Sequence, residues 1–280
     1  MPNKFSLDKK VIVITGASSG IGLACAKEYA NKGARVVMGA RNIEKLQEVE
    51  QELKQEGKEV LGIKTDVSQI DDCKNLIDQA VKQFGGIDIL INNAGISMRA
   101  LFKDVDLAVI RKLMEVNFFG TVYCTKFALP YLLKRKGSLI GVSSVAGFHG
   151  LPGRTGYSAS KFAMNGFLET LRNEYLKDGI HVLIVAPGFT ASNVRKSALL
   201  ADGSPQGESP RKENKMMTPE EVANAIYKGI KYKRRNIILT TEGKLSILVQ
   251  RILPKYLDKV FYNRMASENN SPFKQKQNMN

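Results

Sequence analysis

The sequence predicts an α/β protein with a Rossmann-type, doubly wound parallel sheet of about seven strands and helices on both faces. Short β-branched runs alternate along the chain with segments of helical periodicity, as in right-handed βαβ units. Most of these runs are apolar on both faces, as expected for parallel strands covered by helices on each side. A glycine-rich turn at residues 15–22 joins the first run to the first helical segment. The length of 280 residues suits one such domain.

The predicted strands and helices alternate from the start of the chain. We expect strands at residues 11–15, 35–39, 59–64, 87–92, 137–143, 181–186 and 236–240. We expect helices near residues 21–31, 42–56, 69–84, 107–134, 157–177 and 218–231. These elements assign residues 1–243 to one Rossmann domain.

Three segments depart from this alternation. Residues 190–217 are rich in Ser, Gly, Pro and charge, and their length suggests a flap over a site. Residues 244–266 form a helical extension with a stripe of apolar residues and basic residues on its other faces, and Pro254 is expected to divide it into two helices. Residues 267–280 are polar and are expected to be a disordered tail.

Composition and charge exclude several classes of protein. No apolar run is long enough to span a bilayer, and the start of the chain lacks a signal peptide, so we expect a cytoplasmic protein. The net charge of +15 is concentrated in residues 181–280, which hold 17 Lys+Arg against 8 Asp+Glu. No nucleic-acid motif surrounds these charges, and we expect no nucleic-acid partner. The three cysteines are expected to be buried reduced thiols, and the two histidines argue against a metal site.

The glycine-rich turn is the first candidate site. Gly16, Gly20 and Gly22 permit a tight turn, close approach to a pyrophosphate and close packing of helix on strand. The helix that begins near Ile21 presents its N-terminus to the anion. The turn therefore predicts a dinucleotide site.

The residue after the second strand favours one cofactor over another. An NAD(H) site usually places an acid there to bind the ribose hydroxyls, whereas this chain has Arg41. A cation at the start of a helix is unfavourable with respect to the helix dipole, so a surface role explains Arg41 poorly. We expect NADP(H) rather than NAD(H).

Tyr157 and Lys161 lie four residues apart at the start of a predicted helix, and therefore on one face. A cation one turn away favours tyrosinate and lowers the phenol pKa, so the hydroxyl can exchange a proton near neutral pH. Ser144 follows the strand at residues 137–143, where its hydroxyl can polarise a substrate carbonyl oxygen.

These residues resemble the motifs of the short-chain dehydrogenase/reductase family, and most closely its hydroxysteroid-dehydrogenase-like, NADP-dependent branch. The resemblance covers about residues 8–240. Its motifs, in the family's order, are Thr15-Gly16-x-x-x-Gly20-Ile21-Gly22, Asp66-Val67, Asn92-Asn93-Ala94-Gly95, Asn117-x-x-Gly120, Ser144, Tyr157-x-x-x-Lys161 and Pro187-Gly188 followed by Thr190.

The resemblance implies a role for each catalytic residue. Tyr157 would be the general acid in reduction and the general base in oxidation, and Lys161 would bind the nicotinamide ribose and tune Tyr157. Ser144, with Ser143 as the alternative, would hold the substrate oxygen. Asn117 would anchor a water that relays protons to Lys161.

The resemblance also implies the cofactor contacts. Asp66 and Val67 would contact the adenine, and Asn93, Ala94 and Gly95 the adenosine ribose and neighbouring backbone. Pro187, Gly188 and Thr190 would lie on the nicotinamide side. Ser18 and Ser19 would add hydroxyl bonds to the 2′-phosphate beside Arg41, although some related NADP-dependent enzymes have a basic residue where this chain has Ser19.

The partners are less sharply defined. Apolar residues in 96–99, 145–154 and the flap favour a small apolar carbonyl or alcohol as substrate. We expect a homodimer or homotetramer. The stripe in residues 244–265 packs on the protein's own body or on a second copy, or else contacts an anionic membrane surface. A non-enzymatic nucleotide sensor or scaffold is the alternative function, although such proteins usually lose the tyrosine, lysine or serine.

Overall fold

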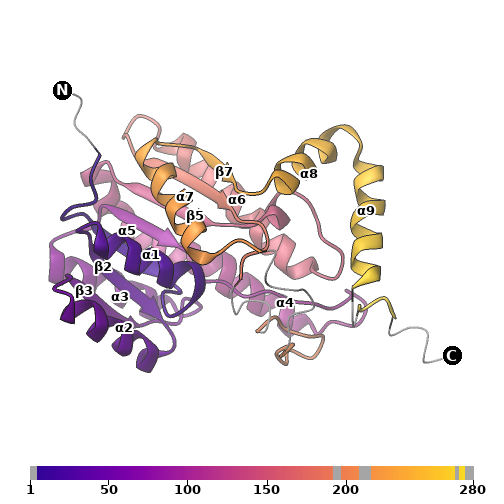
Figure 1. The fold of residues 1–280 in the computed structure, drawn as a ribbon, viewed down its shortest axis with the longest axis horizontal. Helices are drawn as coiled ribbons and strands as arrows, with labels where there is room; N and C mark the ends of the chain where they lie inside the picture. The colour runs from indigo at the N-terminus through magenta and orange to yellow at the C-terminus, as the bar shows by residue number, and fades with distance from the viewer. Residues whose placement is uncertain (1–4, 192–196, 208–215, 269–270, 275–280) are drawn as a thin grey trace.

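The computed structural model describes residues 5–191, 197–207, 216–268 and 271–274 (Figure 1). In this part of the chain one sheet has seven parallel strands in the order β3-β2-β1-β4-β5-β6-β7. The strands are β1 (Val11–Thr15), β2 (Arg35–Ala40), β3 (Val60–Lys64), β4 (Ile89–Asn92), β5 (Ser138–Val142), β6 (His181–Ala186) and β7 (Asn236–Ile238). The predicted doubly wound sheet is confirmed.

Helices cover both faces of the sheet. One core joins the sheet to α1 (Gly20–Asn31), α2 (Ile43–Gln55) and α7 (Pro219–Lys231). The other joins it to α3 (Ile70–Phe84), α5 (Gly120–Arg135) and α6 (Thr155–Glu174). The chain order reverses between β1 and β4, and a crevice opens at the carboxyl ends of strands on either side of such a point.

The segment predicted as one helix at residues 107–134 is interrupted. Helix α4 (Leu107–Met114) ends in a π-helical turn at Glu115–Phe119, and α5 continues from Gly120. The extent of the predicted helical segment is confirmed, and the π-helical turn within it was not predicted because the apolar periodicity continues across a single wider turn. Such turns often occur at functional sites, and this one contains Asn117.

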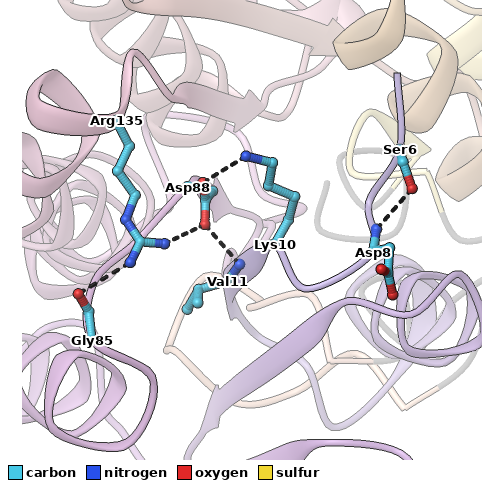
Figure 2. Close-up of polar contacts among 7 residues, drawn as sticks. All are labelled: Ser6, Asp8, Lys10, Val11, Gly85, Asp88 and Arg135. Atoms are coloured by element: carbon cyan, nitrogen blue, oxygen red, sulfur yellow. Dashed lines mark hydrogen bonds and ion pairs between the residues drawn. The ribbon is translucent and has the colours of Figure 1, made fainter. Parts of the chain in front are cut away.

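A buried carboxylate, that of Asp88, connects the amino ends of two central strands, on the side of the sheet away from the crevice (Figure 2). Asp88, directly before β4, accepts hydrogen bonds from Lys10 Nζ at 3.1 Å, the Val11 amide at 2.9 Å and Arg135 Nη1 at 2.5 Å. Arg135 also donates to the Gly85 carbonyl oxygen at 3.1 Å. These bonds connect the starts of β1 and β4 to the end of α5. They therefore fix the relative position of the two strands that flank the crevice, at the ends opposite to it.

Two helices follow the sheet and project from it on one side (Figure 1). They are α8 (Thr241–Ile252) and α9 (Pro254–Ser267). Leu253 separates them, because Pro254 cannot continue the first helix and instead begins the second. Within the described ranges, no helix is both long and apolar enough to cross a membrane. The three cysteines are buried free thiols, as the sequence predicts.

Part of the tail that follows α9 is packed rather than disordered. Ser271 is fully buried, and the Phe273 ring lies 4.7 Å from that of Tyr262 in α9. The polar composition of the tail predicted disorder. The contact between Phe273 and α9 packs this part of the tail instead. Residues 269–270 and 275–280 lie outside the described residues.

Candidate active site

A cavity of about 390 Å³ lies at the carboxyl ends of β1 to β6. Most of the predicted site residues line it: Gly16, Ser18, Ser19, Gly20, Ile21, Arg41, Asp66, Val67, Asn93, Ala94, Gly95, Ser144, Tyr157, Lys161, Pro187 and Thr190. Gly22, Asn117 and Gly188 lie outside this lining. Separate segments of the sequence thus converge on one site.

The glycine turn is built by close contact between backbones. Gly16 has φ +68°, and a Cβ there would lie 2.9 Å from Ala94 Cα. A Cβ on Gly22 would lie 2.3 Å from the Gly16 carbonyl oxygen, so only glycine lets α1 approach the turn. The side-chain Nδ2 of Asn93 donates to the carbonyl oxygens of Thr15 at 2.9 Å and Gly16 at 3.2 Å. These bonds hold the turn against the end of β4.

The N-terminus of α1 fits the diphosphate of a dinucleotide. Its N-cap Ser19 makes no side-chain capping bond, and the first turn contains no acidic residue. The amide groups there lack an intrahelical acceptor, and the helix dipole favours an anion. Gly20 and Ile21, which begin the helix, line the cavity with Ser18 and Ser19.

Arg41 and Asp66 lie at the adenine end of the predicted cofactor site. Arg41 follows β2 and is exposed at the cavity rim, next to Asn42, whose side chain caps α2 by accepting from the Lys45 amide at 2.7 Å. Ser68 donates to Asp66 Oδ1 from its amide at 3.0 Å and its hydroxyl at 2.7 Å. These bonds set the orientation of the Asp66 carboxylate. Sequence reasoning did not select Asn42, although a cap directly after Arg41 follows from its residue type.

Lys161 is buried at the floor of the cavity. Its Nζ donates to the Val142 carbonyl oxygen at 2.9 Å, at the end of β5. Burial in this apolar surrounding lowers the pKa of Lys161 to about 8. The amino group therefore changes its protonation state close to neutral pH.

Tyr157 is the third residue of α6 and is half-buried, one helical turn before Lys161. Burial raises the pKa of Tyr157, whereas its hydrogen bond with Ser144 and the charge of Arg154 act in the opposite direction. The Lys161 Nζ lies 6.0 Å from the centroid of the Tyr157 ring. The expected lowering of the Tyr157 pKa is therefore wrong in sign, because desolvation outweighs the opposing effects of Ser144 and of the Arg154 charge.

The two serines after β5 have different surroundings. Ser144 Oγ bonds to Tyr157 and accepts from the Ala146 amide at 3.2 Å. The Ser143 hydroxyl is buried and has no hydrogen-bond partner among the described residues, and it faces Gly147, on which a Cβ would lie 2.8 Å away. The contact with Tyr157 favours Ser144, as the spacing in the sequence does.

Asn117 is fully buried in the π-helical turn. Its Oδ1 accepts from the Ile96 amide at 2.8 Å, and its Nδ2 donates to the Ile96 carbonyl oxygen and to Ser160 Oγ, each at 2.9 Å. A Cβ on Gly95 would lie 3.1 Å from Asn117 Oδ1 and 3.5 Å from Lys161 Nζ. The side chain thus fixes the segment after β4 to α6, immediately beside Lys161.

The substrate side of the cavity contains Arg154, which sequence reasoning did not select as a site residue. Its Nη1 donates to Ser97 Oγ at 2.8 Å and to the Met98 carbonyl oxygen at 3.3 Å. Leu151 and Phe189 line the same side. The sequence placed Arg154 at the end of the stretch 145–154 expected to border the pocket and gave it no role of its own.

The C-terminal helix α9 supports the loops that form this wall. Arg99, after β4, makes a buried ion pair with Glu268 at 3.0 Å. A Cβ on Gly153 would lie 2.8 Å from Met265 Cε, and the Arg264 guanidinium lies 5.6 Å from the centroid of the Phe189 ring. The extension therefore contacts segments that follow β4, β5 and β6.

The described part of the predicted flap at residues 190–217 also packs on the site. Leu199 is bridged to Met98, and Ser197 lines the cavity. The Asp106 amide donates to the Ala201 carbonyl oxygen at 2.8 Å. Residues 192–196 and 208–215 of the flap lie outside the described residues.

Comparisons with known proteins identify the family and the fold. A family model described as short chain dehydrogenase matches residues 10–202. The 11-beta-hydroxysteroid dehydrogenase-like 2 of Arabidopsis thaliana is 36% identical over 253 residues, which cover 89% of this chain and 79% of that protein. A short-chain dehydrogenase/reductase from Burkholderia phymatum, solved in complex with NAD, shares the fold with a TM-score of 0.80 at 24% identity and covers 90% of this chain and 96% of its own. An alcohol dehydrogenase from Thermococcus sibiricus, complexed with 5-hydroxy-NADP, has a TM-score of 0.73 at 27% identity, with coverage of 83% and 96%.

Proposed function

The chain belongs to the short-chain dehydrogenase/reductase family, and we propose that it is an NADP(H)-dependent oxidoreductase that interconverts a carbonyl and an alcohol on a small, largely apolar substrate. The observation that carries this proposal is the group of half-buried Tyr157 and Ser144 with buried Lys161, all three of which line the cavity. A carbonyl oxygen seated there would meet two hydroxyl groups and no carboxylate.

We assign the cofactor contacts to the residues that fit them. The N-terminus of α1 would hold the diphosphate, Arg41 with Ser18 and Ser19 the 2′-phosphate, and Lys161 the nicotinamide ribose. The choice of NADP(H) rests on Arg41, because a guanidinium binds a phosphate more strongly than it binds a hydroxyl. When bound, the nicotinamide donates a hydride in reduction and accepts one in oxidation.

The chain's own residues would handle the proton. In reduction, the Tyr157 hydroxyl gives its proton to the carbonyl oxygen as the carbonyl carbon gains the hydride, and Ser144 stabilises that oxygen by donating a hydrogen bond. In oxidation, the tyrosinate takes the proton of the substrate hydroxyl. The charge of Arg154 favours the tyrosinate in both directions. Asn117 positions the segment beside Lys161.

We also propose a homodimer in which α8 and α9 contribute the interface. Leu257 and Met265 are buried against the body, whereas Leu248, Ile252 and Leu253 are 55%, 66% and 57% exposed. Packing on the protein's own body therefore accounts for only part of the apolar stripe. An anionic membrane surface is the alternative partner, because basic residues accompany the apolar ones.

The activity test uses the full chain with lipophilic ketones and alcohols. We expect oxidation of NADPH with ketones that is at least ~10-fold more efficient than oxidation of NADH, judged by kcat/KM. The absence of turnover with every compound, while NADPH still binds, would favour the non-enzymatic nucleotide-sensing alternative.

A further inference from the structure

Resting on the oxidoreductase activity proposed above, we propose that Asn165 is a positioning residue that holds the Ser144 hydroxyl against Tyr157. Asn165 lies on α6, eight residues after Tyr157, and it does not line the cavity. It would therefore act through the backbone of the turn that follows β5 and carries Ser144. The position of one catalytic hydroxyl would thus depend on an amide outside the cavity.

One face of α6 contacts the chain as it leaves β5. Tyr157, Lys161 and Asn165 follow one another at intervals of four residues, and therefore lie along one stripe of the helix. Lys161 Nζ donates to the Val142 carbonyl oxygen at 2.9 Å, at the end of β5. Tyr157 bonds to Ser144. The first two members of the stripe thus contact the end of the strand and the start of the turn.

Asn165 makes the third contact, at the far end of the turn. The turn is a short 3₁₀ helix at Val145–Gly147 with Ser144 as its N-cap. Ser144 Oγ accepts from the Ala146 amide at 3.2 Å, and the Ser144 carbonyl oxygen accepts from the Gly147 amide at 2.9 Å. Asn165 Nδ2 donates to the Gly147 carbonyl oxygen at 2.8 Å. Bonds to α6 therefore hold both sides of the turn that carries Ser144.

The turn and α6 are in direct contact at Gly147. A Cβ there would lie 2.8 Å from Asn165 Nδ2, 2.8 Å from Ser143 Oγ and 3.0 Å from the Lys161 carbonyl oxygen. No side chain of Gly147 separates the two backbones. The distance between the turn and the helix is therefore set at this point by the bond to Asn165.

Asn165 is an unfavourable residue here for stability alone. It is 6% exposed, and its helix neighbours Met164 and Leu168 belong to the apolar core. Asparagine is a poor helix former, and a buried amide needs hydrogen bonds to offset its desolvation. Its Oδ1 has no hydrogen-bond partner among the described residues. An apolar side chain would suit the helix and the core better, so the bond to Gly147 is what an amide adds at this position.

The position of Ser144 matters because its hydroxyl is the proposed donor to the substrate oxygen. Such a donor stabilises the transition state only when it already points to the place where negative charge develops. A misplacement of about 1 Å can cost ~100-fold in rate. A turn released from Asn165 would let Ser144 move away from Tyr157, with the cofactor site unchanged.

The kinetic test uses the full chain with NADPH and any accepted ketone. Asn165→Leu keeps the branched outline of the side chain and removes the donor. We expect kcat to fall roughly 10-fold, with KM for the ketone and NADPH affinity changed by less than about 2-fold, because an interaction used only in the transition state is lost. A kcat equal to that of the wild type overturns the positioning role.

A double variant shows whether Asn165 acts through Ser144. Ser144→Ala alone should lower kcat by ~100-fold, as expected for the loss of one donor to the substrate oxygen. Adding Asn165→Leu to Ser144→Ala should lower kcat by less than about 2-fold further, because the residue that it positions is already gone. Losses that multiply in the double variant overturn the role.

Thr170→Val is the matched control on the same helix. Thr170 Oγ1 donates to the Gly166 carbonyl oxygen at 2.9 Å at an exposed position, so the variant removes a side-chain bond of α6 away from the turn. We expect wild-type kcat, and a fall equal to that of Asn165→Leu would assign the loss to the helix as a whole. If Asn165→Leu does not bind NADPH, Asn165→Asp replaces it, since an ionised carboxylate cannot donate to Gly147. Loss of NADPH binding in both variants would make Asn165 a determinant of folding and overturn the role.

An NMR measurement separates this role from the activity itself. In protein with isotopically labelled tyrosine, the Tyr157 ring signal is identified by its loss in Tyr157→Phe. With NADPH bound, this signal should shift in Ser144→Ala and in the same direction in Asn165→Leu, but not in Thr170→Val. If no carbonyl compound is turned over, the oxidoreductase activity fails and the signal still judges Asn165. Identical Tyr157 signals in the wild type and in Asn165→Leu refute the positioning role.

Discussion

Tyr157→Phe removes the proton that the proposed reduction requires and keeps the ring in its half-buried position. We expect turnover of any accepted ketone to fall by ~100-fold or more, because general acid catalysis is lost. NADPH affinity, followed by fluorescence titration, should change little. Near-normal turnover in this variant would show that another group supplies the proton.

Arg41, at the rim of the cavity, is the residue on which the proposed preference for NADP(H) rests. Arg41→Ala should weaken NADPH binding by about 1.5–3 kcal/mol and leave NADH nearly unchanged, since only NADPH carries the 2′-phosphate. Titrating both cofactors with wild type and variant measures the difference. Equal losses for the two cofactors would contradict a contact between Arg41 and the phosphate.

Lys161 makes the stability of the cofactor-free protein depend on pH. Burial lowers the pKa of Lys161 from 10.5 to about 8, so between these values the unfolded state binds more protons than the folded state. The amino group's contribution to the free energy of unfolding therefore rises with pH over this window and is lost as pH falls through about 8. Denaturant unfolding at pH 8 and pH 10 should show the wild type gaining on the order of 1–2 kcal/mol relative to Lys161→Met. A pH-independent difference between the two proteins would show that the pKa is not lowered.

Among the individual site residues, the sequence predicted those that are recognised by their spacing along the chain. It did not assign roles to residues that are recognised only by their contacts in the folded structure. Tyr157, Lys161 and Ser144 come together as predicted because helix and strand geometry fixes their relative positions. Arg154 was predicted to border the pocket but received no role of its own, because its contacts are with Ser97 and Met98, more than fifty residues away in the sequence. The sign of the Tyr157 pKa shift was also wrong, since burial cannot be calculated from spacing.

At the scale of elements, the ion pair of Arg99 and Glu268 joins the end of α9 to the substrate wall. Glu268→Met leaves a buried guanidinium without its carboxylate, and we expect a raised KM and a lower Tm. The double variant Arg99→Met/Glu268→Met removes both charges and should recover much of the Tm, because apolar replacement of a buried pair is often tolerated. A KM unchanged in Glu268→Met would show that α9 does not support the wall.

The boundaries of most elements followed from the sequence, whereas irregular turns did not. Helices α1, α2, α3 and α7 agree with the prediction to within a residue at each end because their caps and apolar stripes are local signals. The π-helical turn at Glu115–Phe119 is stabilised by bonds from Asn117 to Ile96, which is distant in the sequence. The packed position of Ser271 likewise depends on contacts made elsewhere in the fold.

At the scale of the whole molecule, the exposed apolar side of α8 and α9 makes the assembly state testable. We expect a dimer by light scattering and a monomer when Leu248 and Ile252 are both replaced by Glu, because the interface loses its apolar area. Sedimentation with anionic vesicles at low and high salt tests the alternative partner. A wild-type monomer that binds vesicles only at low salt would assign this surface to the membrane instead.

The contacts of α9 also bear on the order in which the protein matures. A chain is synthesised from its N-terminus, and its early elements can begin to fold before the later ones emerge from the ribosome. The glycine turn, Arg41 and the Tyr157 helix all precede α9, whereas the wall around Arg99 and Gly153 is supported by residues 264–268. A nascent chain would therefore acquire its nucleotide crevice before its substrate wall. Proteolytic loss of the segment after the sheet would leave a fragment that sequesters NADPH without consuming it.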